Sequence, residues 1–238
     1  MTAEAPARHD AMHRAVQVGA AATSALPQVR FVADLVCPWC YLGFHRLMAL
    51  AASRPFRLVW HPFLLNPNLP PEGVPRSLYL ERKFGTAGLA EAVQQRAAAA
   101  ASAGGLELRL GQIRRQPNTV AAHALLMRAG ERTVELATAL FQAFFQDGSD
   151  LGSPEVLARI GAGFGIDWED LPAARRGALS AHESACRSGV DGVPVFIFGD
   201  SHAIAGAQPM ACLEALLDLE RYRLERAAGP AAQGRQAS

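Results

Sequence analysis

Apolar and polar positions divide the start of the chain into three elements. Residues 29–36 are mainly apolar with several β-branched side chains, which is typical of a buried strand. Residues 41–52 repeat apolar side chains at helical spacing, and residues 56–64 alternate before a loop rich in Asn and Pro at 66–71. The pattern predicts strand, helix and strand, a βαβ unit whose crossover is expected to be right-handed.

Residues 76–189 are expected to be mainly helical, because apolar side chains recur there at helical spacing. Ser153 before Pro154 is typical of a helix start, and Asn118 is expected to cap another helix. We interpret the Phe and Leu stripes as core surfaces rather than as a cofactor-binding motif. The predicted helices lie near residues 87–102, 119–129 and 133–146, from 154 onward, and at 176–188.

Strand-like alternation returns near the end of the chain. Residues 192–198 form a predicted strand that a proline opens, and a turn at 199–200 leads into a return strand at 201–206. A last helix is expected at residues 209–226. The whole pattern predicts an α/β fold with a large all-helical insertion between a β-α-β half and a β-β-α half.

The domain boundaries follow from this pattern. Residues 28–70 and 190–226 are expected to form the α/β domain, and residues 71–189 the helical insertion. Residues 1–27 are Ala-rich and aperiodic, so they are expected to be a disordered tail, as are residues 227–238.

A short apolar segment at residues 15–22 follows Arg14 and faintly resembles a signal peptide. The segment is short and dilute, and Glu4 and Asp10 precede it, so we favour a tail and a cytoplasmic location.

Composition argues against several classes of protein. The 238 residues are 50% hydrophobic with a formal net charge of +1, which argues against nucleic-acid binding. No apolar run approaches the roughly 20 residues that a membrane-spanning helix needs. The four cysteines are too few for a disulfide-dense scaffold of this length.

Cys37, Pro38, Trp39 and Cys40 stand where the first strand ends and the first helix begins. Helix positions three apart have β-carbons roughly 5–6 Å from each other, close to disulfide reach. Pro38 fits the first turn, and Cys37 lies where free N–H groups and the helix dipole stabilise a thiolate. We therefore assign Cys37 as the attacking thiol and Cys40, one turn inside, as the resolving thiol.

Two alternatives remain for this pair. A zinc site would need further ligands, but no second Cys-X-X-Cys or His-X3–5-His motif is present. An inert structural disulfide would stabilise little, because it closes a very small loop. We favour a redox-active disulfide with no metal and no other cofactor. The further zinc ligands available in the sequence are His182, Cys186, His202 and Cys212. We expect Cys186 and Cys212 to be ordinary buried thiols, and we consider a second, regulatory disulfide between them a less favoured hypothesis.

Five segments together resemble the DsbA-like thioredoxin-fold oxidoreductases, and most closely the bacterial FrnE-type branch. The resemblance spans residues 29–226 and implies a thioredoxin-like fold. This branch is related to the 2-hydroxychromene-2-carboxylate isomerases and the kappa-class glutathione transferases. The segments are DLVCPWCYLG at 34–43, WHPFLLNP at 60–67, NT at 118–119 with AH at 122–123, GVPVF at 192–196 and AGAQP at 205–209.

The resemblance also implies roles for single residues. The family proline that matches Pro194 has a cis peptide bond and lies against the active disulfide. Val193 and Pro194 would then hold a substrate beside Cys37, since a proline that opens a strand leaves the Val193 backbone free to pair. The alternative is an ordinary strand-opening proline. Asn66 resembles an Asn that helps bind glutathione in the related enzymes, although Asn66 before proline is also a common turn starter.

Asp34 and His123 are further candidate residues. Asp34 precedes Cys37 by three positions and is a candidate for proton transfer to or from Cys40, or it simply closes the strand. His123 is a candidate substrate-binding residue, but it shares a helix face with Val120 and Met127, which favours a partly buried structural histidine.

The sequence favours a thiol–disulfide oxidoreductase, acting on protein or small-molecule disulfides as a monomer or homodimer. The first alternative is a glutathione-dependent isomerase or transferase, and glutathione is a possible co-substrate of either. That group normally has Ser in place of the cysteine pair, and Gly-Ser-Asp-Arg where residues 206–209 read Gly-Ala-Gln-Pro. A noncatalytic partner in a biosynthetic pathway is the second alternative, against which the intact pair argues.

The dipeptide between the cysteines predicts the redox character. Pro-Trp carries no charged His to stabilise a thiolate, so the pair is expected to be less oxidising than one with Pro-His.

Overall fold

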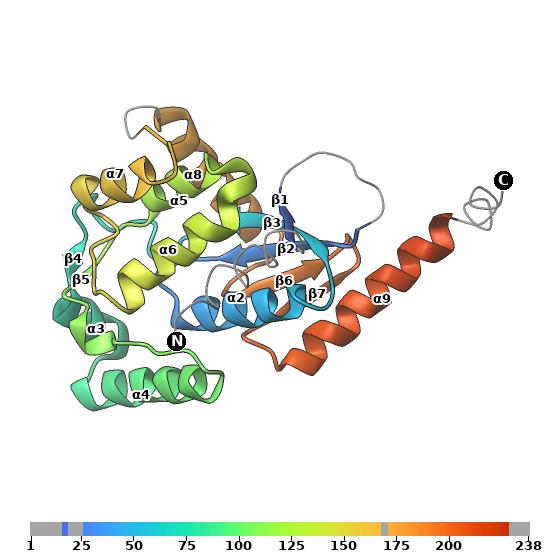
Figure 1. Cartoon of the computed structure of the whole chain (residues 1–238). Helices are drawn as coiled ribbons and strands as arrows, with labels where there is room; N and C mark the ends of the chain where they lie inside the picture. Colours follow the sequence, from blue (N-terminus) through green and yellow to red (C-terminus); the bar gives the residue numbers. More distant parts are fainter. Residues whose placement is uncertain (1–15, 19–25, 168–170, 229–238) are drawn as a thin grey trace, which may run out of the picture.

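The structure is a computed structural model that describes residues 16–18, 26–167 and 171–228 (Figure 1). Its centre is a five-stranded sheet in the order β1-β3-β2-β6-β7. Strands β1 and β2 pair parallel with β3, whereas β6 pairs antiparallel with β2 and β7. The strands are β1 (Val16–Val18), β2 (Gln28–Ala33), β3 (Phe56–Pro62), β6 (Val195–Phe198) and β7 (His202–Ala205).

The predicted α/β plan is confirmed. Helix α2 (Pro38–Ala51) connects the parallel strands β2 and β3, and Phe31 lies opposite Trp60 in their register. Strand β2 ends at Ala33, earlier than expected, because the chain turns there and Cys37 N donates to Asp34 O at 3.2 Å.

The insertion is helical, but it is not all-helical as expected. Strands β4 (Val74–Pro75) and β5 (Arg115–Gln116) pair antiparallel within it. Two-residue strands are too short to show alternation in a sequence, which explains why they escaped prediction. The helices of the insertion are α3 (Arg76–Phe84), α4 (Ala87–Ala103), α5 (Val120–Met127), α6 (Thr133–Phe145), α7 (Pro154–Ala162) and α8 (Pro172–Arg187), with short 3₁₀ turns at Leu110–Gln112 and Gly130–Arg132.

The N-terminal segment also differs from the expectation of a wholly disordered tail at 1–27. Val16–Val18 forms β1, and Val16 lies opposite Phe56 of β3. Pairing through the backbone needs no apolar pattern, so three residues at a sheet edge leave little signal. The rest of that segment up to residue 25 lies outside the described residues. At the other end, α9 (Met210–Ala228) runs two residues beyond the predicted 226, and residues 229–238 lie outside the described residues.

Successive residues of β2 point to opposite faces of the sheet and anchor two cores. Phe31 belongs to the main core, where its ring lies 5.0 Å from that of Phe196 and 6.1 Å from that of Phe44 on α2. The next residue, Val32, packs with Ala185 of α8 in a smaller core. The sheet is therefore covered on both faces.

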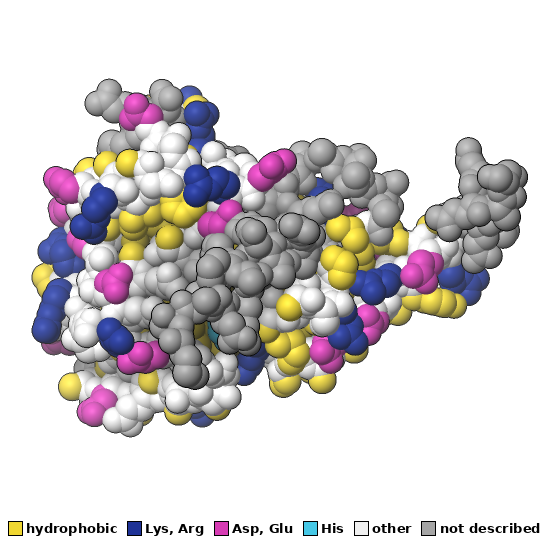
Figure 2. Space-filling model, viewed as in Figure 1, with side chains coloured by type: hydrophobic (Ala, Val, Ile, Leu, Met, Phe, Trp, Pro, Cys, Tyr) yellow, Lys and Arg dark blue, Asp and Glu magenta, His cyan; other side chains and the backbone are white. Residues whose placement is uncertain are grey.

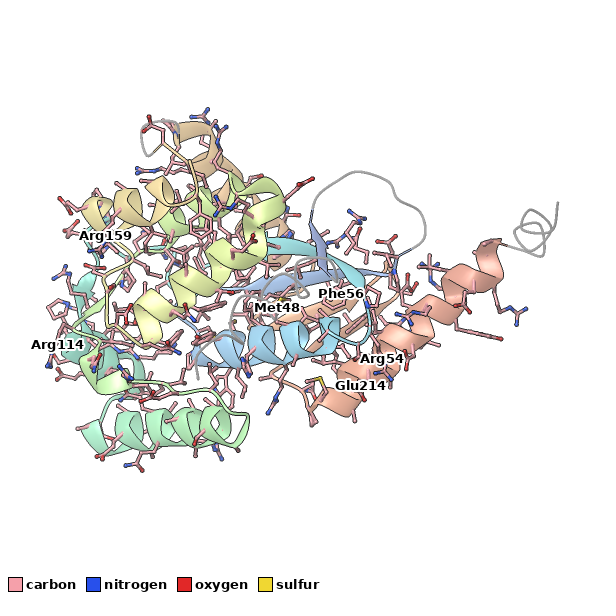
Figure 3. The ribbon with its side chains drawn as sticks, in the orientation of Figure 1. Met48, Arg54, Phe56, Arg114, Arg159 and Glu214 are labelled. Carbon is pink, nitrogen blue, oxygen red and sulfur yellow. The ribbon has the colours of Figure 1, made fainter. Side chains whose placement is uncertain are left out.

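The helices place the ends of α2 in different surroundings. In Figure 1, α2 runs along the sheet, with α3 and α4 near its first turn and α9 near its last. Just after α2, Arg54 Nε lies 3.1 Å from Asp218 Oδ1 and Arg54 Nη1 lies 3.5 Å from Glu214 Oε1, both on α9. Figure 3 labels Arg54 and Glu214. Such half-exposed pairs contribute little to stability, so buried residues such as Leu213 carry most of this contact.

The surface has no dominant charge on the face that Figure 2 draws, where Lys and Arg are interspersed with Asp and Glu. Among the described residues, no helix is both long and apolar enough to cross a bilayer.

Candidate active site at the Cys37–Cys40 turn

The two cysteines occupy the first turn of α2. Cys37 is the N-cap, with extended backbone angles of φ −91° and ψ 115°, and Pro38 is the first helical residue. Tyr41 N donates to Cys37 O at 3.1 Å, the first hydrogen bond of the helix. Both cysteines are free thiols, and Cys37 is 4% exposed while Cys40 is 0% exposed. Both are buried, and of the two only Cys37 lines the cavity described below.

Burial distinguishes the two sulfurs chemically. Removal from water raises the pKa of the Cys40 thiol well above its ordinary value, and the adjacent Cys37 raises it further. Cys40 is thus a neutral thiol at physiological pH and must lose a proton before it can attack a disulfide. Cys37, in contrast, lies at the positive end of the helix dipole.

A strand end forms the opposite wall of the site. Cys37 Sγ donates to Val193 O at 3.6 Å, and the Val193–Pro194 peptide bond is cis. Gly206 N donates to Pro194 O at 2.7 Å, which fixes this segment to the β7 end of the hairpin. The structure thus places Val193 O against Cys37 Sγ, and the substrate-holding role that the family resemblance implies for Val193 and Pro194 stays a prediction.

Gly43 permits this close approach. A β-carbon at Gly43 would lie 2.9 Å from Phe196 Cζ and 3.3 Å from Pro194 Cγ. The first distance is shorter than carbon atoms tolerate, so α2 reaches β6 only because residue 43 has no side chain.

Asp34 lies buried behind the thiols at the end of β2. Its Oδ2 accepts a hydrogen bond from Leu65 N at 2.8 Å, and its Oδ1 lies 3.4 Å from His123 Nε2 without forming an aligned hydrogen bond. His123 Nδ1 accepts from Trp60 Nε1 at 3.3 Å, so the imidazole proton is on the nitrogen that faces Asp34. After burial and Cys37, the charge of Asp34 also raises the pKa of Cys40, and the proton-transfer role of Asp34 stays a prediction.

His123 and Asn66 are placed differently from the substrate-binding roles expected of them. His123 is 0% exposed and contacts Asp34, so a substrate in the solvent-facing site does not meet it. Asn66 is half-buried in a turn where its backbone oxygen accepts a hydrogen bond from Leu69 N at 3.3 Å. Its side-chain Nδ2 has no hydrogen-bond partner among the described residues. It does not line the cavity beside Cys37, although the preceding Leu65 does.

That cavity, of about 300 Å³, separates the dithiol from the helical insertion. Its far wall on α3 was not predicted from the sequence, although residues 76, 79, 80, 83 and 84 share one helix face. The dithiol side is formed by Val36, Cys37, Pro38, Trp39, Leu65, Gly192 and Val193, and the insertion side by Arg76, Tyr79, Leu80, Lys83, Phe84, Val93, Gln94, Ala97 and Leu110.

The remaining cysteines lie outside the site. Cys186 was predicted to be buried but is exposed, because the adjacent Ala185 occupies the packed face of α8. Its Sγ lies 3.8 Å from the ring nitrogens of His182. Cys212 is half-buried. Within the described ranges, no group of three or more His, Cys, Asp and Glu side chains is arranged to hold a metal ion.

Comparison with protein-family models matches residues 28–218 to the DSBA-like thioredoxin domain. The chain belongs to this family. The match covers the dithiol turn, the whole insertion and the Val193–Pro194 segment, so the geometry described above is that of a DSBA-like domain.

Individual proteins are also similar to this chain over most of its length. A probable DsbA oxidoreductase from Streptomyces coelicolor superimposes with a TM-score of 0.67 and 26% identity, covering 86% of this chain and 91% of that one. The uncharacterized protein YwbO of Bacillus subtilis is 26% identical over 195 residues, 75% of this chain and 90% of YwbO. A 2-hydroxychromene-2-carboxylate isomerase has a TM-score of 0.60 at 16% identity, covering 84% and 98%, which shows a shared fold. The fold alone therefore accommodates two chemistries.

Proposed function

We propose that this chain is a thiol–disulfide oxidoreductase of the FrnE-type branch. The Cys37 thiolate attacks one sulfur of a substrate disulfide, forming a mixed disulfide and releasing a substrate thiolate. The Cys40 thiolate then attacks Cys37 Sγ, releasing the second substrate thiolate and forming the Cys37–Cys40 disulfide. Two electrons pass from the protein to the substrate, and in the opposite direction the same steps oxidise a dithiol.

One observation carries the proposal. Cys37 occupies the N-cap of α2 and lines the cavity, with Val193 O 3.6 Å from its Sγ, whereas Cys40 is fully buried one turn inside. A substrate that pairs with the Val193 backbone is thereby placed against the attacking sulfur. The buried position of Cys40 favours a role restricted to resolving the mixed disulfide.

Asp34 completes the proposed machinery. Because burial keeps Cys40 protonated, resolution needs a proton acceptor inside the core. We assign this role to Asp34, held by Leu65 N and adjacent to His123. Family members need no cofactor, and we propose none here beyond the dithiol itself.

A dithiothreitol-driven insulin reduction assay tests the mechanism. Cys37→Ser is expected to abolish turnover, because no attacking sulfur is left. Cys40→Ser is expected to accumulate mixed disulfides with substrate, since the first step still occurs. Cys186→Ser is the matched control and should retain activity, as Cys186 lies exposed on α8. Equal activity in all four proteins would refute the thiol mechanism.

The glutathione-dependent isomerase is the weaker candidate, because none of the described residues lining the cavity carries a carboxylate to receive the ammonium group of glutathione. Calorimetry with glutathione distinguishes the two. Tight saturable binding together with isomerisation of an aromatic conjugate would reverse this ranking. A noncatalytic partner in a biosynthetic pathway would instead leave insulin reduction absent in the wild-type chain.

We further propose a cytoplasmic location and either a monomer or a homodimer. The near-neutral net charge of +1 supports substrates other than nucleic acid. Light scattering of the full chain determines the oligomeric state.

A further inference from the structure

The cavity beside Cys37 combines apolar walls with two cations and no acidic residue among its described lining. Apolar residues such as Leu65, Leu80 and Phe84 form much of its lining, and Arg76 and Lys83 are its two cations. None of the described lining residues is acidic. A ligand that fills this cavity therefore meets net positive charge in an otherwise apolar environment, where electrostatic attraction is strengthened.

Both cations have neutral partners. Arg76 Nη1 donates to the Gln116 side-chain oxygen, and Arg76 Nε is shielded from water with no hydrogen-bond partner among the described residues. Lys83 Nζ donates to the Tyr79 hydroxyl at 2.8 Å and lies 5.3 Å from the Tyr79 ring centre. The Arg76 guanidinium lies 5.5 Å from the same ring. Cation–π contacts hold the two groups in place without neutralising them.

We propose that this cavity binds one half of a small disulfide that has an apolar body and an anionic group, such as an aryl carboxylate. The anion pairs with Arg76 and Lys83 on α3, and the apolar body lies against the inner faces of α3 and α4. This orientation presents the disulfide to Cys37 at the other wall. A volume of about 300 Å³ suits one such half, since sites for small molecules begin near this size.

The same lining disfavours glutathione disulfide. Each half of glutathione disulfide carries an ammonium group as well as carboxylates, and burying an unpaired charge is costly. The described lining offers that ammonium only cations and apolar side chains. The cavity thus selects against a zwitterionic disulfide in favour of an apolar anionic one.

The proposal rests on the disulfide exchange proposed above, and the same two steps account for every electron and leaving group. Cys37 displaces one aryl thiolate and forms a mixed disulfide with the other half, and Cys40 displaces the second aryl thiolate. The protein dithiol supplies both electrons, so a single turnover needs no external reductant.

Single-turnover kinetics of the reduced full chain test the cavity. The probes are bis(carboxyphenyl) disulfide, the matched neutral bis(carbamoylphenyl) disulfide, and glutathione disulfide, followed by thiolate release against disulfide concentration. We expect Arg76→Gln to raise the half-saturation concentration for the carboxylate probe about tenfold, as loss of a buried charge-assisted hydrogen bond predicts. Lys83→Gln, at a more exposed position, should raise it about threefold.

Controls separate the possible failures. Arg82→Gln removes an exposed charge of α3 that does not line the cavity and should change nothing. The carbamoyl probe should react equally with all variants, which also verifies their folding, and Arg76→Lys should restore part of the affinity for the carboxylate. Equal half-saturation for the two aryl probes, or a lower value for glutathione disulfide, would overturn the cavity proposal. Absence of reaction with every disulfide would instead overturn the proposed function.

Discussion

At the scale of single residues, the environment of Cys40 decides which step of exchange is demanding. Burial raises the pKa of the Cys40 thiol well above its ordinary value, so the thiolate is scarce near neutral pH. Cys37, in contrast, caps α2 at the positive end of the helix dipole and lines the cavity. Proton removal from Cys40 is therefore expected to limit resolution of the mixed disulfide.

Asp34→Asn tests the proton acceptor. Asparagine keeps an oxygen that can accept from Leu65 N but cannot take a proton from Cys40. We expect the resolution step to slow about 100-fold at pH 7, the lower range for general acid–base catalysis, while attack by Cys37 changes little. Stopped-flow measurement of the two thiolates released in one turnover separates the steps.

The pH profile adds a signature that a merely structural role would not give. Without an internal acceptor, resolution in Asp34→Asn should accelerate as pH rises, because more Cys40 is then ionised, and level off only above its raised pKa. His123→Gln serves as a comparison, since it alters the neighbour of Asp34 and keeps the carboxylate. Equal slowing of both steps in Asp34→Asn would argue for a structural role.

At the scale of elements, the site depends on how closely α2 lies on the strand that follows Pro194. Gly43→Ala puts a methyl group 2.9 Å from Phe196 Cζ, and the Phe196 ring is fixed by Phe31 at 5.0 Å. Overpacking costs about 1–3 kcal/mol. That cost exceeds the roughly 1 kcal/mol that alanine gains over glycine in a helix.

We therefore expect Gly43→Ala to lower the free energy of unfolding by about 1 kcal/mol, and to slow disulfide exchange as α2 moves from Val193. Urea denaturation and insulin reduction measure the two effects. Gly88→Ala on α4 is the matched control, because its new β-carbon meets nothing within 4 Å. An unchanged or raised stability in Gly43→Ala would contradict the close-packing argument.

Elements also differ in how far the sequence could predict them. Strand β2, helix α2 and the β6–β7 hairpin were predictable, because their apolar periodicity and turn residues are local signals. The cationic wall on α3 was not, because this helix buries no side chain completely and its role depends on folding back toward Cys37. The contact of Asp34 with His123 likewise arises from packing between distant segments.

At the scale of the whole molecule, the redox potential of the Cys37–Cys40 pair measures the difference in folding free energy between the oxidised and reduced chain. A strong oxidant is one whose reduced form is the more stable, because its thiolate is stabilised. Here Trp39 supplies no charge, and the second sulfur lies in a core that disfavours ionisation. The helix dipole at Cys37 is the main remaining stabilising influence on the motif.

We therefore expect the reduction potential of the Cys37–Cys40 pair to be more negative than that of a strong oxidant, which is about −120 mV. Equilibration with glutathione redox buffers measures it. Urea denaturation of the oxidised and reduced chain should show the matching difference, about 1.4 kcal/mol for each 30 mV. Trp39→His should shift the potential upward by adding a cation beside Cys37, whereas Trp39→Phe should leave it nearly unchanged. A wild-type potential near −120 mV would mean that stabilisation of the thiolate comes from elsewhere in the fold than the dipeptide. The two measurements must agree through the thermodynamic cycle, so the potential is tested on the whole molecule as well as on its thiols.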